Sequence, residues 1–328
     1  MQSRSLLPHI VTTVGLIIVV ALSGLARLSA AEKASEVPAW LRAHVGEGEG
    51  QIAPVVLRRA RALYLQKVNG GTVKNSCYFA MDATRPAGFG RRFYTICESD
   101  RTFRAVPSGH GSGRHVAGAN FANGIRCAKN FSNAMDSKLT TGGAYVTDET
   151  ITSFKGYYRS AAGKYLPFSR SFVQFDGEDD TANARPRAIG GHPAVVLRVA
   201  CRRKDPDSSH ANKDGYVPVG TLVNYAAGRS NGCTSWTTSD AGQIIPMVKD
   251  KPTTLYIYPE STDIAAVVQA VKAGRAPSRA GLYWNASCLS EIRSPKFWPK
   301  ETLEPILVQY KKDHPAPPPR PLPICKGQ

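Results

Sequence analysis

The sequence is poor in acidic residues and lacks several motifs that would assign it to a common class of protein. Against 42 lysines and arginines it has only 25 aspartates and glutamates, which gives a formal charge of +17. No glycine-rich loop followed by Lys and Ser marks a phosphate site, and no zinc-finger spacing or aromatic RNA-binding signature accompanies the positive charge. No internal repeat is visible. The composition therefore argues against nucleic acid as a partner and against repeat architectures.

The N-terminus carries the pattern of an export signal. Arg4 precedes an apolar run from Ile10 to Leu25, and Ser29-Ala30-Ala31 offers small residues for cleavage. We expect residues 1–31 to be a secretory signal peptide, or else an uncleaved anchor that tethers the chain to a membrane, although the run is short of the ~20 residues that span a bilayer. Either reading places the rest of the chain outside the cytoplasm, in the periplasm or cell envelope. There the positive charge fits an anionic cell wall, the alternative being a solubilising excess of charge without a specific partner.

The seven cysteines agree with export, because an oxidising compartment pairs six and leaves one free. Cys77 and Cys97 flank two strand-like runs around a Pro- and Gly-rich turn, so in a hairpin they would face one another. We further expect Cys288 to pair with Cys325, and by elimination Cys127 with Cys201, although six cysteines allow 15 arrangements. The remaining cysteine is Cys233.

The organisation of the chain is predicted from its periodicity. Short β-branched and aromatic runs separated by turn residues indicate strands at residues 77–81, 92–96, 144–147, 171–175, 188–190, 194–199 and 254–258. The spacing of apolar residues predicts helices at 52–68 and 262–271. We interpret the polar stretch 202–212 as an inserted surface loop. Residues 315–323 are rich in proline, which predicts an extended segment. We divide the chain into the signal or anchor (1–31), an N-terminal helical segment (32–70), a β-rich domain (71–260) and a C-terminal extension with a Pro-rich tail (261–328).

The residues from Gly228 to Thr234 place a cysteine directly behind a glycine, where a thiolate can face a substrate carbonyl. This makes Cys233 the candidate nucleophile. Upstream, His192 follows a short apolar run and is the candidate base that would raise the thiolate fraction. His210 is a weaker alternative base, because nothing apolar around it would hold the ring. A thiol with a histidine predicts acyl transfer, whereas a buried inert thiol is the alternative.

A series of motifs resembles the murein L,D-transpeptidases, the YkuD-type family of cell-wall enzymes, over roughly residues 60 to 260. Besides Ser-Xaa-Gly-Cys and the upstream histidine, these motifs are Met81-Asp82, Arg92-Phe93-Tyr94, His110-Gly111-Ser112-Gly113, Phe131-Ser132-Asn133, Gly143-Ala144-Tyr145-Val146-Thr147, Arg187-Ala188-Ile189 and Leu255-Tyr256-Ile257-Tyr258-Pro259. The resemblance implies a mainly β fold, an L,D-transpeptidase-like sandwich or barrel with a few peripheral helices. It also implies transfer between peptidoglycan stem peptides through a Cys233 thioester, with no cofactor and no metal.

Further site residues are expected near the thioester. Backbone amides at Gly232 and Cys233 would stabilise the oxyanion, Ser230 would position the cysteine loop, and Arg229 would orient a substrate carboxylate. His110 and Tyr145 would line the cleft, or instead stabilise a turn and pack in a strand. Asn231 departs from the family, which commonly has a ring there. The alternatives to transpeptidation are an L,D-carboxypeptidase or endopeptidase that uses the same thioester, and a catalytically silent wall-binding module.

Overall fold

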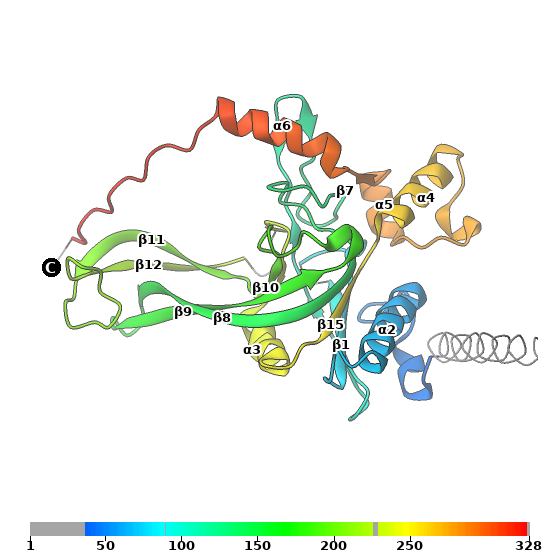
Figure 1. Ribbon diagram of the computed structural model, residues 1–328, viewed down its shortest axis with the longest axis horizontal. Coiled ribbons are helices and arrows are strands. Elements are labelled where there is room, and N and C mark those ends of the chain that lie inside the picture. Colours follow the sequence, from blue (N-terminus) through cyan, green and yellow to red (C-terminus); the bar gives the residue numbers. More distant parts are fainter. Residues whose placement is uncertain (1–36, 89, 226–228, 327–328) are drawn as a thin grey trace, which may run out of the picture.

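A large mixed β-sheet forms the centre of the protein in the computed structural model, which describes residues 37–88, 90–225 and 229–326 (Figure 1). The predicted signal segment lies outside these residues. The strand order is β14-β10-β9-β8-β15-β1-β2-β3, and β12 joins through β8. The sheet confirms the predicted mainly β architecture. Its strands are β1 (Cys77–Asp82), β2 (Arg91–Cys97), β3 (Thr102–Pro107), β8 (Gly143–Arg159), β9 (Tyr165–Gly177), β10 (Gly190–Pro193), β11 (Val195–Lys204), β12 (Tyr216–Asn224), β14 (Thr234–Trp236) and β15 (Thr254–Tyr258).

Helices and short strands surround this sheet (Figure 1). The helices at 52–68 and 262–271 are confirmed, as α2 and α4. The helical elements are η1 (Ala39–His44), α2 (Pro54–Asn69), η2 (Asp179–Thr181), α3 (Thr238–Val248), α4 (Ser261–Lys272), η3 (Pro277–Ala280), α5 (Ala286–Ile292) and α6 (Lys300–Asp313). The short strands are β4 (His110–Gly111), β5 (His115–Val116), β6 (Ala119–Asn120), β7 (Asn130–Phe131), β13 (Arg229–Ser230) and β16 (Lys296–Phe297).

The middle of the sheet is covered on both faces, which explains why β1 reads as an almost continuous apolar run. Successive side chains of a strand point to opposite faces. Tyr78 and Ala80 accordingly share a core with α2, whereas Phe79 and Met81 belong to a core that includes residues of α3, α4 and α5. The segment after residue 260 therefore contributes to the main core of the β-rich domain.

Two long hairpins, β8–β9 and β11–β12, extend beyond the helices (Figure 1). They are joined where β12 runs parallel to β8, with Val219 opposite Tyr157. The predicted loop at 202–212 is wrong at its start, because β11 continues to Lys204 before the chain turns. Pairing with β12 provides hydrogen-bond partners for the backbone of this segment, and its polar side chains remain at the surface. Arg203 lies over the Tyr165 ring, 4.2 Å from its centroid.

Three disulfides are present, and they are typical of proteins outside the cytoplasm. The Cys77–Cys97 bond is confirmed, since the two residues face each other across the β1–β2 hairpin. The other two expected pairs are wrong: the bonds are Cys127–Cys288 and Cys201–Cys325. Cys127 shares the main core with Cys288 of α5, which brings these residues together across 161 positions of sequence.

The proline-rich tail explains the third bond. Residues 315–323 carry no helix or strand and are exposed, and they lead from the end of α6 back to β11 (Figure 1). There the Arg202 amide donates to the Pro323 carbonyl at 2.8 Å, and the Cys325 amide donates to the Arg202 carbonyl at 3.0 Å. These contacts hold Cys325 beside Cys201. Among the residues that the structure describes, no helix is long and apolar enough to cross a membrane.

Candidate active site

The Cys233 turn is held by its own backbone and by Ser230. Gly232 has φ +112°, a conformation that favours glycine. The Ser230 hydroxyl donates to the Cys233 carbonyl at 2.5 Å and accepts from the Gly232 amide at 3.1 Å. Ser230 therefore fixes the turn that presents the cysteine. It also occupies the Gly232 amide, so the expectation that this amide is free for an oxyanion is wrong in this conformation.

His192 reaches the same place from the neighbouring strand. β10 and β14 run parallel, with Gly191 opposite Thr234 and His192 opposite Ser235. The sequence places His192 at the end of an apolar run at 188–190, whereas the strand itself is Gly190–Pro193 and includes the histidine. The residue is only 7% exposed, and its imidazole stacks on Phe172 at a centroid distance of 6.2 Å. Strand pairing thus brings together two residues 41 positions apart.

Both residues line a pocket of about 690 Å³. Its walls come from the loop after β4, from β9, from the segment before β10, and from the residues around the cysteine turn. The lining residues are Ser112, Gly113, Arg170, Phe172, Arg187, Ala188, His192, Val196, Tyr225, Ser230, Asn231 and Cys233. No acidic side chain is among these described residues, whereas two arginines are.

The two arginines are the residues that sequence reasoning missed as parts of the site. Arg187, quoted above only as part of a motif, donates to Thr141 Oγ1 at 2.7 Å and to the Leu139 carbonyl at 2.7 Å. It thereby holds the loop against which Gly232 packs. Arg170 on β9 donates to His192 Nδ1 at 2.6 Å and to the Tyr225 hydroxyl at 2.8 Å. Nothing local in the sequence distinguishes Arg170 from the many other surface arginines.

Burial keeps the thiol and the imidazole neutral at rest. It raises the pKa of the Cys233 thiol, and the backbone amides of Gly190 and Cys233, together with Arg170, lower that pKa only in part. The thiol contacts the Ala188 carbonyl at 3.5 Å. Burial, and then the charge of Arg170, lower the pKa of His192 to about 4. The resting pair is therefore a thiol and a neutral imidazole rather than an ion pair.

The hydrogen bond from Arg170 also fixes the imidazole tautomer. Two groups lie within hydrogen-bond distance of Nδ1: an Arg170 terminal nitrogen at 2.6 Å, which can only donate, and the Pro193 carbonyl at 3.1 Å, which can only accept. The Arg170 contact is the shorter of the two, so we assign Nδ1 as its acceptor and place the imidazole proton on Nε2. The tautomer with its proton on Nδ1 would instead donate to the Pro193 carbonyl, and the short contact with the Arg170 guanidinium disfavours it.

Other expected site residues lie elsewhere. His110 is fully buried, with Arg92 at 2.9 Å from its Nδ1 and the Gly124 carbonyl at 2.9 Å from its Nε2. It stabilises the interior and does not line the pocket. Tyr145 is also buried, and its hydroxyl donates to the Thr141 carbonyl at 2.8 Å. The contacts of both residues indicate a structural role rather than a place in the cleft, because each polar atom already has a partner in the protein interior.

Two further predicted residues are Arg229 and His210. The backbone of Arg229 pairs with His110 in β13–β4, whereas its side chain lies outside the described part of the structure. His210 lies in the β11–β12 loop and stacks on Phe154 at 3.9 Å between ring centroids. It is exposed and is not among the residues lining the pocket, so it is poorly placed to act as the base for Cys233.

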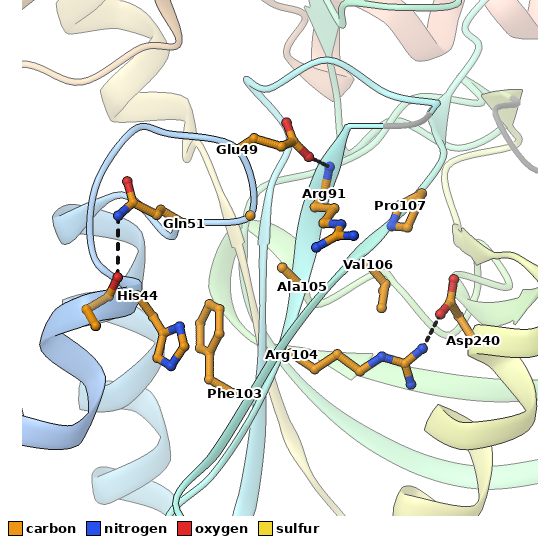
Figure 2. A pocket seen from close by; sticks show the side chains of 12 residues that line it. His44, Glu49, Gln51, Arg91, Phe103, Arg104, Ala105, Val106, Pro107 and Asp240 are labelled. Carbon is orange, nitrogen blue, oxygen red and sulfur yellow. Dashed lines mark hydrogen bonds and ion pairs between the residues drawn. The ribbon is translucent and has the colours of Figure 1, made fainter.

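A second pocket of about 690 Å³ lies along β3, and Figure 2 shows it. Its Arg104 is paired with Asp240 at 2.5 Å, and Glu49 accepts from the Arg91 amide at 3.1 Å. No cysteine lines it. Size does not distinguish the two pockets, but only the first combines a free thiol with an imidazole.

Comparison of the chain with protein-family models, curated proteins and solved structures finds no match. Within the described residues no group of three His, Cys, Asp or Glu side chains is arranged to hold a metal ion.

Proposed function

We propose that the chain is an exported cysteine acyltransferase that acts on peptidoglycan stem peptides by L,D-transpeptidation. One observation carries the proposal: six of the seven cysteines form disulfides, and the free one, Cys233, lines a pocket together with His192. A free thiol in an otherwise oxidised protein, in the same pocket as an imidazole, is suited to thioester chemistry. The substrate class comes from the resemblance to the L,D-transpeptidases.

In the proposed reaction Cys233 attacks a carbonyl of the donor peptide. The sulfur–carbon bond forms while the thiol proton passes to His192, which then gives it to the leaving amine. In the second half an acceptor amine attacks the thioester carbonyl and loses its proton to His192. The carbon–sulfur bond then breaks, and the sulfur takes that proton back, which restores the thiol and the neutral imidazole. Because the resting pair is neutral, proton transfer accompanies the attack rather than preceding it. The Gly190 and Cys233 amides near the sulfur stabilise the negative charge that develops there.

The hydrogen bond from Arg170 holds His192 in a form that cannot accept this proton. In the neutral imidazole the lone pair is on Nδ1, and Arg170 donates to it at 2.6 Å. Taking up the thiol proton, or exchanging the tautomer, therefore requires that the hydrogen bond from Arg170 be broken. We expect substrate binding to break it.

The test uses purified tetrapeptide stems and a carbapenem, whose strained carbonyl is an acyl donor. Intact mass should show a one-to-one adduct, peptide mapping should place it on Cys233, and Cys233→Ala should abolish both adduct and turnover. Cross-linked products support transpeptidation, whereas release of D-alanine with water as the acceptor would assign a carboxypeptidase. No adduct and no D-alanine from a folded protein with a titratable thiol would favour a wall-binding module instead.

A further inference from the structure

The two arginines of the pocket around Cys233 make no hydrogen bond to a carboxylate among the described residues. Buried or half-buried cations in proteins are normally paired with carboxylates. The hydrogen-bond partners of Arg187 and Arg170 are instead hydroxyls, carbonyls and an imidazole, all of them neutral. No acidic residue is among the described residues that line the pocket. Such a site is complementary to an anionic group.

Arg170 is the arginine with donors to spare. Arg187 uses both terminal nitrogens to hold the loop at residues 137–141. The three contacts of Arg170 all involve one terminal nitrogen, at 2.6 Å to His192, 2.8 Å to Tyr225 and 3.3 Å to the Pro193 carbonyl. Its Nε is buried and has no hydrogen-bond partner. A guanidinium with unused N–H groups is suited to bind a carboxylate through two parallel hydrogen bonds.

The same nitrogen links this site to the base. The titratable side chains that line the pocket with His192 are Arg170 on β9, Arg187 before β10, Tyr225 after β12, and Cys233. Of these, Arg170 is in contact with the imidazole and disfavours its protonation. A carboxylate bound to Arg170 would offset that charge and compete for the N–H group that now occupies Nδ1.

We propose that Arg170 is a specificity-determining residue that binds a carboxylate of the acyl donor beside Cys233 and, by doing so, releases His192 Nδ1 to act as the base. The acyl-donor role rests on the proposed function, whereas anion capture by Arg170 does not. The proposal therefore makes a prediction that can be tested without any cell-wall substrate.

The test compares alkylation of Cys233 by iodoacetate and by iodoacetamide. In both reactions sulfur forms a bond to the same methylene carbon and iodide leaves, so the two reagents differ only in a carboxylate against an amide. The ratio of their second-order rate constants, followed by intact mass without reductant, should be at least about tenfold higher in the wild type than in Arg170→Gln, because a hydrogen bond to a charged group is strong. Arg170→Lys, which keeps the charge and loses the fork, should fall between them.

Arg104→Gln is the matched control, because it removes an arginine from the second pocket and should leave the ratio unchanged. A wild-type measurement covers the case in which Arg170→Gln fails to fold: sodium trifluoroacetate, a carboxylate that stays ionised at pH values near the pKa of His192, should raise that pKa in an NMR titration relative to sodium chloride at equal ionic strength. Equal ratios in folded wild type and Arg170→Gln, a His192 insensitive to trifluoroacetate, or a thiol that neither reagent reaches would overturn the proposal. A retained ratio with no acyl-enzyme would instead refute the proposed function and leave the anion site standing.

Discussion

Replacing Gly232 by alanine tests whether the cysteine turn is as confined as its contacts indicate. An added Cβ would lie 2.7 Å from the Leu139 carbonyl oxygen and 2.8 Å from Ile189 Cδ1, in a backbone with φ +112°. The carbonyl cannot retreat cheaply, because Arg187 donates to it at 2.7 Å. Backbone strain costs roughly 1–3 kcal/mol and overpacking roughly 1–3 kcal/mol. We therefore expect Gly232→Ala to lower the free energy of unfolding by about 4 kcal/mol.

Two other glycines separate these contributions. Gly274 has φ +66° with nothing within 4 Å of an added Cβ, so Gly274→Ala should show the backbone cost alone, about 1 kcal/mol. Gly242 lies inside α3 without a positive φ and with open space around it, so Gly242→Ala should stabilise by about 0.5–1 kcal/mol.

Thermal unfolding of the three variants provides the measurement. At about 2 °C per kcal/mol for a chain of this size, Gly232→Ala should melt about 8 °C below the wild type, and its Cys233 should react with iodoacetamide at an altered rate. A melting temperature for Gly232→Ala no lower than that of Gly274→Ala would refute the reasoning, because the packing contribution would then be absent.

Three further predictions concern titration, the base and the disulfides. The pKa of folded His192 is held at about 4, below its ordinary value of 6.5, so the unfolded chain binds the proton first as the pH falls; we expect roughly 3 kcal/mol of stability to be lost between pH 6.5 and 4. Urea midpoints across this range should fall, and His192→Gln should flatten the profile; an identical slope in the variant would contradict the assignment. His192→Ala should slow acylation by ~10²- to 10⁴-fold, whereas His210→Ala should change little, and the reverse result at equal folded content would move the base to the loop. Alkylation without reductant should label Cys233 alone, and non-reducing peptide maps should join Cys201 to Cys325; a map joining Cys325 to another cysteine would contradict the course of the tail.

Local sequence contained enough information for some of the elements and for the choice of Cys233 as the candidate nucleophile, but it did not predict α3, α6 or the full length of β8. An odd number of cysteines in an exported chain leaves one thiol free, and a glycine before Cys233 predicts a sharp turn there. Cys77 and Cys97 were predictable as a pair because a short hairpin sets which residues face each other. The α2 and α4 helices follow from the spacing of apolar residues, which is a property of neighbouring positions.

Only the tertiary structure decided how distant segments meet. Pairing the remaining cysteines by elimination uses no information on the distance between them. It therefore could not show that Cys127 lies beside α5 or that the tail returns Cys325 to β11. The burial of His110 depends on Arg92, and the state of His192 depends on Arg170, a contact formed across two strands of the sheet. The sequence by itself determined which residues have reactive chemistry. Folding decided their protonation and their partners, because the removal of water and the approach of a charge act through space rather than along the chain.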